Sequence, residues 1–269
     1  MNVCRHRGSQ IALGRGRRET LQCPYQAWTY DLDGSLRAAP RSEREQSFER
    51  SDLSLRPALV QQLGPFVFVC ADLDAPPLDE ALDGMPELLA RDLHLHALVF
   101  RERAEYEEGR TGRSRPRTTS SATTAPWLTR ASPGSLTRAP TTTLRPGDGV
   151  WTQLGRSRDG DGSCQFHLVW PALKVNVYPG PPNLSIGPVW PVGAERTAGF
   201  LDYFFGAGVS AEEASELIAF DDQVGREDAA LVESVQRGVR SGMIDRGRLL
   251  LDSETLVNSF QRRIFAALS

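Results

Sequence analysis

Apolar and polar residues alternate in several short runs, and this period of two predicts β-strands. The clearest runs are residues 165–170, 174–178 and 184–193. Residues 65–71 form a continuous apolar run with the length of one buried strand. Shorter strands are predicted at residues 11–13 and 28–30, and the Asp33-Gly34 pair predicts a hairpin turn.

The C-terminal third has a helical pattern instead. Ser210 and Glu213 have the spacing of a capping box, which predicts a helix start. A second helix is predicted over residues 227–238, ended by Gly238. A last helix is predicted from Asp252-Ser253, because apolar residues recur there at helical spacing: Leu256, Val257, Phe260, Ile264 and Leu268.

Three of the four histidines lie in predicted strands. His94 and His96 alternate with apolar residues up to Phe100, as on the polar face of a strand. Two such histidines can bind a metal, but no third ligand is near in sequence, which favours a solvated or hydrogen-bonded face. His167 is predicted to be an ordinary strand residue, and Cys70, in its apolar run, a buried thiol.

Composition places limits on the whole chain. Its 269 residues allow one large or two modest domains, and 40% apolar content is enough for a core. A net charge of −3 gives no general attraction to nucleic acid or anionic membrane. No apolar run is long enough for a membrane span and no secretory signal is visible. Four cysteines do not indicate a disulfide framework, so a reducing cytoplasm is predicted.

Residues 109–146 interrupt the pattern. They contain no Asp, Glu or Lys, but seven Arg among many Thr, Ser and Pro: Arg110, Arg113, Arg115, Arg117, Arg130, Arg138 and Arg145. This composition predicts an irregular linker or a basic arm. A structureless segment of this length is uncommon inside a compact domain.

Two short pairs of potential metal ligands lie near the N-terminus. The first is Cys4-Arg-His6 and the second, sixteen residues on, is Cys23-Pro-Tyr-Gln26. A Rieske [2Fe–2S] centre is held by two Cys on one iron and two His on the other. The spacing, the C-P-Y-x-A-W-T-Y string and the turn after it closely resemble the Rieske domain of aromatic-ring-hydroxylating oxygenases, large (alpha) subunit. Gln26 departs from the pattern, because a neutral amide binds iron poorly. The alternative, ordinary thiols at Cys4 and Cys23, is disfavoured because spacing and flanks agree together.

The resemblance implies an α+β fold. A truncated all-β Rieske domain is expected at residues 1–73, with upstream strands missing before Met1. A catalytic domain of helix-grip type, an antiparallel sheet flanked by helices, is expected at residues 74–269, with residues 109–146 irregular or out of frame.

The resemblance also implies an activity. The chain would be a terminal oxygenase, a dioxygenase of aromatic hydrocarbon catabolism, hydroxylating an aromatic or small organic substrate with O₂. Electrons would pass from an NAD(P)H-dependent reductase or ferredoxin through the [2Fe–2S] cluster to a mononuclear Fe(II). A homo-oligomer, commonly a trimer, is implied, with no nucleic-acid or membrane partner. Residues 233–238, E-S-V-Q-R-G, are also similar to members acting on quaternary amines such as choline or carnitine, so the substrate stays open.

Asp228 is the candidate ligand of the mononuclear iron. Residues 227–238 resemble the family helix that supplies the carboxylate of a 2-His-1-carboxylate iron site. The alternative is a solvated helix-face acid beside Glu227. The two histidines of the triad are missing from this sequence, and one carboxylate does not hold Fe(II) in a working geometry.

A shifted reading frame accounts for residues 109–146. Neighbouring residue pairs in this segment are compatible with a second frame reading ANWKVAAENYFECYHCAVAHPGF, which resembles the family's mononuclear-iron segment with its two His. Besides the oxygenase, two interpretations of the chain belong to other classes: a non-catalytic remnant of a decayed or mis-sequenced oxygenase gene, which compensating indels near codons 109 and 143 would support, and a binding module whose basic arm contacts nucleic acid. The coding DNA distinguishes the three.

Overall fold

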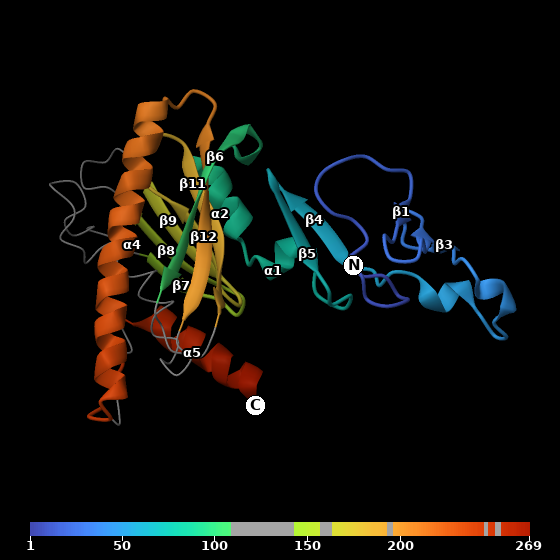
Figure 1. The fold of residues 1–269 in the computed structure, drawn as a ribbon. Coiled ribbons are helices and arrows are strands. Elements are labelled where there is room, and N and C mark those ends of the chain that lie inside the picture. Colours follow the sequence, from blue (N-terminus) through green and yellow to red (C-terminus); the bar gives the residue numbers. More distant parts are fainter. Residues whose placement is uncertain (109–142, 157–162, 193–195, 245–246, 251–253) are drawn as a thin grey trace. The chain divides into compact units, whose positions relative to one another are not determined.

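The computed structural model describes residues 1–108, 143–156, 163–192, 196–244, 247–250 and 254–269 (Figure 1). The out-of-frame interpretation falls mostly on residues 109–142, outside the described residues. Two units are distinguished: Met1–Gln62 with Val67–Ala75, and Leu63–Phe66 with Pro76–Ser269. Among the described residues, no helix is long and apolar enough to cross a membrane. The domain bounds expected from the sequence, 1–73 and 74–269, stay a prediction.

The first unit holds a small antiparallel sheet of order β1-β2-β3. Its strands are β1 (Leu21–Gln22), β2 (Thr29–Tyr30) and β3 (Leu36–Ala38), followed by the short 3₁₀ turns η1 (Ser42–Arg44) and η2 (Arg50–Leu53). The strands β4 (Leu59–Leu63) and β5 (Phe66–Cys70) form a separate two-stranded sheet. The core of this unit consists of Cys4, Ile11, Cys23, Trp28, Tyr30, Leu36 and Ala39.

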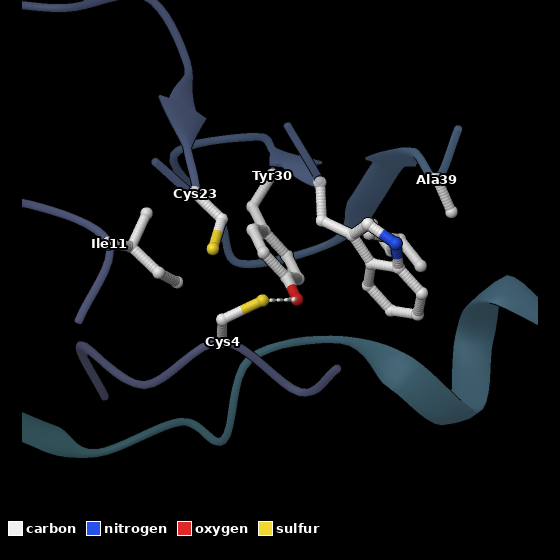
Figure 2. Close-up of a cluster of buried hydrophobic side chains, with 7 residues drawn as sticks. Cys4, Ile11, Cys23, Tyr30 and Ala39 are labelled. Carbon is white, nitrogen blue, oxygen red and sulfur yellow. Dashed lines mark hydrogen bonds between the residues drawn. The ribbon is translucent and has the colours of Figure 1, made fainter. Parts of the chain in front are cut away.

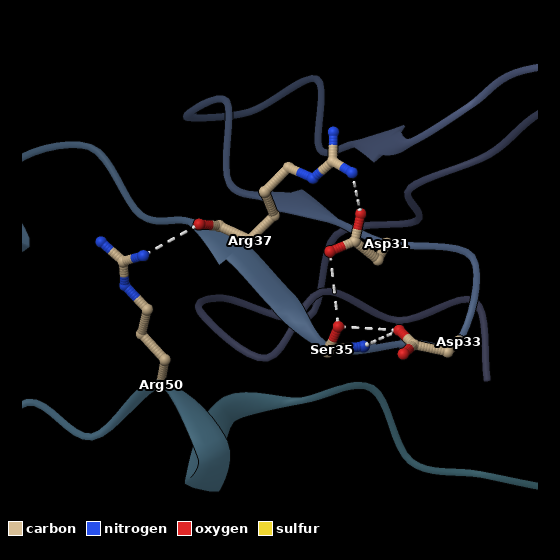
Figure 3. A network of polar contacts seen from close by, with 5 residues as sticks. All are labelled: Asp31, Asp33, Ser35, Arg37 and Arg50. Carbon is tan, nitrogen blue, oxygen red and sulfur yellow. Dashed lines mark hydrogen bonds and ion pairs between the residues drawn. The ribbon is translucent and has the colours of Figure 1, made fainter.

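The hairpin turn between β2 and β3 is confirmed. Gly34 has a φ of 92°, the left-handed region that favours glycine. The Ser35 N–H and Oγ donate to Asp33 Oδ1 at 2.9 and 2.7 Å (Figure 3). Arg37 is paired with Asp31 at 2.5 Å, which joins the two strands beside the turn.

Two predictions for the first unit are wrong. Residues 11–13 form no strand, because the amide of Asn2 takes the place of a strand partner: its Oδ1 accepts from the N–H groups of Ile11 and Ala12 at 3.0 and 2.9 Å. The strand over the apolar run exists as β5, but alternate residues are exposed and Cys70 is only half-buried. No residue of β5 is fully buried, so the prediction of a buried thiol at Cys70 is wrong.

The second unit is built on a seven-stranded antiparallel sheet of order β6-β12-β11-β10-β9-β8-β7. The strands are β6 (Leu98–Glu108), β7 (Thr143–Pro146), β8 (Val150–Arg156), β9 (Ser163–Val169), β10 (Leu173–Val177), β11 (Asn183–Pro191) and β12 (Thr197–Gly206). The helices are α1 (Leu78–Ala81), α2 (Met85–Asp92), α4 (Ala211–Arg240) and α5 (Thr255–Leu268), with a 3₁₀ turn η3 (Leu95–Ala97). The predicted antiparallel sheet flanked by helices is confirmed.

Two helices pack on one face of this sheet. Helix α4 runs along the sheet (Figure 1). Its Leu217 packs against two clusters of buried residues, one that includes Phe166 of β9 and one that includes Tyr203 of β12. Helix α5 packs Leu256 and Phe260 against Trp151 of β8. Helix α2 contacts the opposite face through β9. The sheet is therefore covered on both faces.

Helix α4 begins as predicted. The Ser210 hydroxyl accepts from the Glu213 N–H at 3.2 Å, and the Glu213 carboxylate accepts from the Ser210 N–H at 2.9 Å. The expected second helix over residues 227–238 is not separate, since α4 runs for 30 residues through Gly225 and Gly238. Packing of one continuous face outweighs the weak helix propensity of glycine.

Two further boundaries differ from the sequence predictions. The strand expected through His94 and His96 starts only at Leu98, because residues 95–97 turn in a 3₁₀ helix that buries Leu95; both histidines are exposed. Residues 143–146, expected to be irregular, form β7, which pairs with β8 and lies against α5. Helix α5 and β8 supply the partners that the composition of this segment did not reveal. The expected start of the last helix, Asp252-Ser253, falls largely outside the described residues.

Candidate functional site

Cys4 and Cys23 begin two loops, residues 4–9 and 23–28, with the same backbone hydrogen-bond pattern. Each Cys N–H donates to the carbonyl five residues on, at 2.8 Å in both loops. Each Cys carbonyl accepts from the N–H four residues on, Gly8 at 2.9 Å and Ala27 at 3.0 Å. Gly8 and Ala27 have φ values of 74° and 57°, so each loop closes through a left-handed residue. We call these the cysteine loops.

The cysteine loops bring both thiols into the core of the first unit (Figure 2). Cys4 is 2% exposed and Cys23 3%. Tyr30 supports them, with its Oη 3.4 Å from Cys4 Sγ and accepting from the Arg5 N–H at 3.0 Å. Burial and the Cys4 thiol raise the pKa of Tyr30 well above its ordinary value. The phenol therefore stays protonated beside the sulfur.

The second cysteine loop favours the thiolate, which is the form that binds metals. Burial opposes ionisation of Cys23, but the N–H groups of Tyr25 and Gln26 and the side chains of Cys4 and Ser9 lower its pKa below the ordinary value. These backbone and side-chain donors together outweigh the effect of burial on the pKa of Cys23.

The nitrogen half of the predicted cluster site is incomplete. His6 is half-buried and its ring stacks on Trp28, with centroids 4.7 Å apart and an interplanar angle of 7°. Gln26 is exposed. In the described parts of the chain, no three His, Cys, Asp or Glu side chains gather into a group that could hold a metal. The paired thiols fit one half of a Rieske cluster, but one imidazole and an exposed amide do not fit the other, so no electron-transfer step through such a cluster follows from these residues.

A cavity of about 240 Å³ lies in the second unit, between α4 and the strands β6, β10 and β12. Its wall includes three tyrosines, Tyr106, Tyr178 and Tyr203. Helix α4 contributes Asp221 and Asp228, and β10 contributes Lys174. The predicted iron ligand Asp228 therefore lines a cavity of ligand size, where it is half-buried and acts electrostatically on Tyr178.

A buried carboxylate, Asp221, joins three elements of the cavity wall through hydrogen bonds. Asp221 accepts hydrogen bonds from Tyr178 Oη at 2.5 Å and Tyr203 Oη at 2.8 Å. Burial raises the pKa of Asp221, while the two phenols and Lys174 oppose that rise. Burial, and then the charge of Asp221, raise the pKa values of both tyrosines well above the ordinary value, so both remain donors. We call these three side chains the aspartate clamp.

Sequence reasoning missed the aspartate clamp, although one signal was present. Asp221 precedes Asp228 by seven residues, two helical turns, so both lie on the same face of α4. Asp221 could therefore have been found by looking for other acidic residues on the face of the predicted helix that carries Asp228. Its partners on β10 and β12 could not be identified from spacing.

The cavity contains no imidazole. The chain has four histidines, and none lies among the described residues that line it. His94 and His96 line a separate hollow beside α2, and His6 belongs to the first unit. A 2-His-1-carboxylate iron site needs two imidazoles beside Asp228. The residues present therefore do not fit a mononuclear iron, and no reaction step through such an iron follows from them.

His167 is an internal strand residue, as predicted. Its Nδ1 lies 2.8 Å from Thr152 Oγ1 and its Nε2 lies 3.1 Å from Gln165 Oε1. The Gln165 amide nitrogen donates to the Leu88 carbonyl at 2.9 Å, so its oxygen faces the histidine. This network assigns the proton to Nε2 and makes Thr152 the donor to Nδ1. Burial, with a smaller effect of Arg145, lowers the pKa of His167 to about 3.

Two family models match the sequence. The model of the ring hydroxylating alpha subunit (catalytic domain) matches residues 93–269, and that of the Rieske [2Fe-2S] domain matches residues 1–50. Together these domains imply a [2Fe–2S] cluster and a mononuclear iron in the proteins that carry them. The two matched regions contain the cavity with Asp228 and the cysteine loops, respectively.

The sequence and the structure are also similar to individual proteins of known activity. The carnitine monooxygenase oxygenase subunit of Acinetobacter baumannii is 30% identical over 284 aligned residues, covering 94% of this chain and 72% of that protein. The chloroplastic choline monooxygenase of Spinacia oleracea is 29% identical, covering 96% of this chain and 62% of that protein. A crystal structure of a quaternary ammonium Rieske monooxygenase with gamma-butyrobetaine matches with a TM-score of 0.78 at 28% identity, covering 99% of this chain and 76% of that one. These proteins are monooxygenases, so the expected dioxygenase role in aromatic hydrocarbon catabolism finds no support among them.

Proposed function

Because the chain belongs to the ring-hydroxylating oxygenase alpha-subunit family and carries a Rieske-type N-terminal region, we propose that it derives from a terminal monooxygenase of quaternary ammonium compounds. The family is one of non-haem iron oxidoreductases. The carnitine and choline monooxygenases among its relatives support this substrate class over an aromatic hydrocarbon.

The observation that carries the proposal is the cavity beside Asp228. A quaternary ammonium group cannot donate hydrogen bonds, so it is recognised by aromatic surfaces and by negative charge. The cavity offers Tyr106, Tyr178 and Tyr203 together with the carboxyl groups of Asp221 and Asp228. These residues would bind and orient the substrate, and Asp228 lies on the same wall of the cavity as Asp221.

A complete member of the family supplies activated oxygen at its mononuclear iron, with electrons delivered by its cluster. For this chain, we propose Cys4, His6 and Cys23 as the remaining cluster ligands and Asp228 as the remaining iron ligand. The proposed partners are an NAD(P)H-dependent reductase or ferredoxin and further copies of the chain, in keeping with the name "oxygenase subunit" of the bacterial relative. The unpaired thiols of all four cysteines support a reducing compartment such as the cytoplasm.

A second candidate function is a non-catalytic remnant of such an enzyme. It is favoured by Gln26, which is exposed where a second imidazole is needed, and by the cavity without histidine among its described lining residues. Metal sites that lose one ligand bind weakly, and the defects at the two sites lie in series. We therefore propose that the chain as written keeps the scaffold and the cavity but does not turn over.

The decisive experiment measures metal and turnover together. The purified chain is reconstituted with iron and sulfide, and its iron content, Rieske-type EPR signal and carnitine-dependent NADH oxidation with a reductase are recorded. Gln26→His is the comparator, and we expect a partial gain of the EPR signal without turnover. Turnover by the unaltered chain that Asp228→Ala abolishes would support the oxygenase and refute the remnant. Sequencing the coding DNA across codons 1 to 150 tests the shifted-frame interpretation.

A further inference from the structure

Cys4 and Cys23 bring two thiols together in the core of the first unit. Both belong to one cluster of buried side chains, and all four cysteines of the chain are free thiols. Figure 2 shows the two side chains extending from their separate loops into the same space. The Cys4 side chain is also a hydrogen-bond partner of the Cys23 thiol. The two sulfur atoms are therefore neighbours across the cysteine loops.

Two sets of contacts hold the cysteine loops together around the thiols. At the exposed rim, the Arg7 guanidinium donates to Tyr25 Oη at 3.2 Å and lies 5.5 Å from the centroid of the Tyr25 ring. In the core, Tyr30 Oη lies 3.4 Å from Cys4 Sγ and accepts from the Arg5 N–H at 3.0 Å. Tyr30 belongs to β2, the strand that follows the second loop, so its side chain anchors the first loop to that strand.

The sulfur atoms lie close beneath the surface of the first unit. Cys4 and Cys23 are 2% and 3% exposed. The residues that flank them within the loops are exposed: Arg5, Arg7, Gly8 and 24–27. A local opening of one loop therefore lets a molecule as small as hydrogen peroxide reach the thiols, and such openings cost far less free energy than unfolding of the whole unit.

Two neighbouring thiols have a chemistry that a single thiol lacks. Hydrogen peroxide oxidises the first thiol to a sulfenic acid: an S–O bond forms, the O–O bond breaks and a water leaves. The sulfur of the second thiol then attacks the sulfenic sulfur, which forms the S–S bond and releases another water. Two thiols and one hydrogen peroxide thus give one disulfide and two waters, and two electrons pass from the sulfurs to the peroxide.

We propose that Cys4 and Cys23 are a peroxide-reactive thiol pair that closes to a reversible disulfide between the cysteine loops. The disulfide removes both sulfurs from metal binding, because metals bind the thiolate. It also spares the thiols from irreversible oxidation to sulfinic acid, because the neighbouring thiol traps the sulfenic acid first. The proposal does not rest on the proposed function, since a thiol pair needs neither iron nor substrate.

The test uses the full chain, reduced and treated with a chelator, after thiol titration has confirmed its four free thiols. The chain is exposed to hydrogen peroxide, the remaining thiols are blocked with N-ethylmaleimide, and the tryptic peptides are mapped by mass spectrometry without reduction. Cys4 and Cys23 lie in the tryptic peptides 1–5 and 19–37. We expect the disulfide between these peptides to be about tenfold more abundant than any other pairing, because a disulfide forms only between thiols that come close together. Dithiothreitol should restore all four thiols.

Cys70→Ser is the matched control, since it removes the half-buried thiol of the same unit, and the link between Cys4 and Cys23 should persist in it. In Cys4→Ser, Cys23 has no thiol beside it and should gain the mass of a sulfinic acid instead. In urea, the same treatment of the unaltered chain should spread the disulfides over several pairings, because the loops no longer hold the two thiols together.

Three results on the unaltered chain would overturn the proposal, so it stays decidable even if a variant fails to fold. The first is survival of all four thiols in peroxide. The second is a link between Cys4 and Cys23 that is as frequent in urea as in the folded chain. The third is an oxidation that dithiothreitol does not reverse.

Discussion

We expect Tyr203→Phe to lower the free energy of unfolding of the second unit by about 1–3 kcal/mol, the cost of leaving a buried acceptor without its donor. The substitution removes only the hydroxyl that donates to Asp221 at 2.8 Å, and it creates almost no cavity. Asp221 keeps the shorter bond from Tyr178, at 2.5 Å, so the carboxylate stays partly compensated. Tyr178→Phe should cost at least as much as Tyr203→Phe.

The double variant Tyr178→Phe/Tyr203→Phe tests whether the two hydrogen bonds to Asp221 contribute to stability independently of each other. With neither phenol present, a buried carboxylate takes up a proton instead of remaining charged. The loss is then limited, so the double variant should be less destabilised than the sum of the two single variants, by about 1 kcal/mol. Strict additivity would show that Asp221 does not couple the two tyrosines.

Urea unfolding followed by helical circular dichroism is the assay, because the described α-helices all belong to the second unit. The midpoint should shift with little change in the slope m. Tyr106→Phe is the control, since it removes a buried hydroxyl that has no partner among the described residues and should leave stability unchanged or slightly higher. A loss in the control equal to that in Tyr203→Phe would refute the reasoning.

The pH dependence supplies an independent check on Asp221. Burial raises its folded-state pKa above the ordinary 3.8, so between these two values the folded state binds more protons than the unfolded state. The contribution of Asp221 to stability must therefore fall as pH rises from about 3.8 through the raised pKa. Asp221→Asn should lack this decline, and an unchanged pH profile would contradict the assignment.

Two further outcomes are expected. His167 should remain neutral in NMR titrations from about pH 8 to 5, because its pKa is lowered to about 3; stability should fall as pH drops below 6.5, where only the unfolded state takes the proton. Gly199→Ala should displace the Tyr106 ring and destabilise the second unit by roughly 1–3 kcal/mol, measured by thermal unfolding. Gly208→Ala, in the same unit and with open space around its Cβ, is the matched control.

Local signals were predictable from the sequence. The cysteine loops follow from the spacing around Cys4 and Cys23, and the start of α4 follows from Ser210 and Glu213, because each depends on residues only a few positions apart. The strands of the large sheet follow from alternation, since each presents one face to the helices.

Long-range partners were not predictable. Asp221 meets Tyr203 and Tyr178 across 18 and 43 residues, and nothing in a single sequence joins them. The side chain of Asn2 replaces a strand partner for Ile11, which the local pattern of alternation does not show. Strand β7 depends on β8 and α5, so the composition of residues 143–146 gave no sign of it.

The backbone pattern of the cysteine loops has a consequence for the history of this gene. The loops close through N–H groups, carbonyls and the left-handed Gly8 and Ala27, and none of these bonds uses the side chain at position 26. A histidine at that position and the present Gln26 differ by one base, so ligand loss is a single mutational step that leaves the loop scaffold in place. The reverse step restores a histidine at position 26 without rebuilding the hydrogen bonds of either loop.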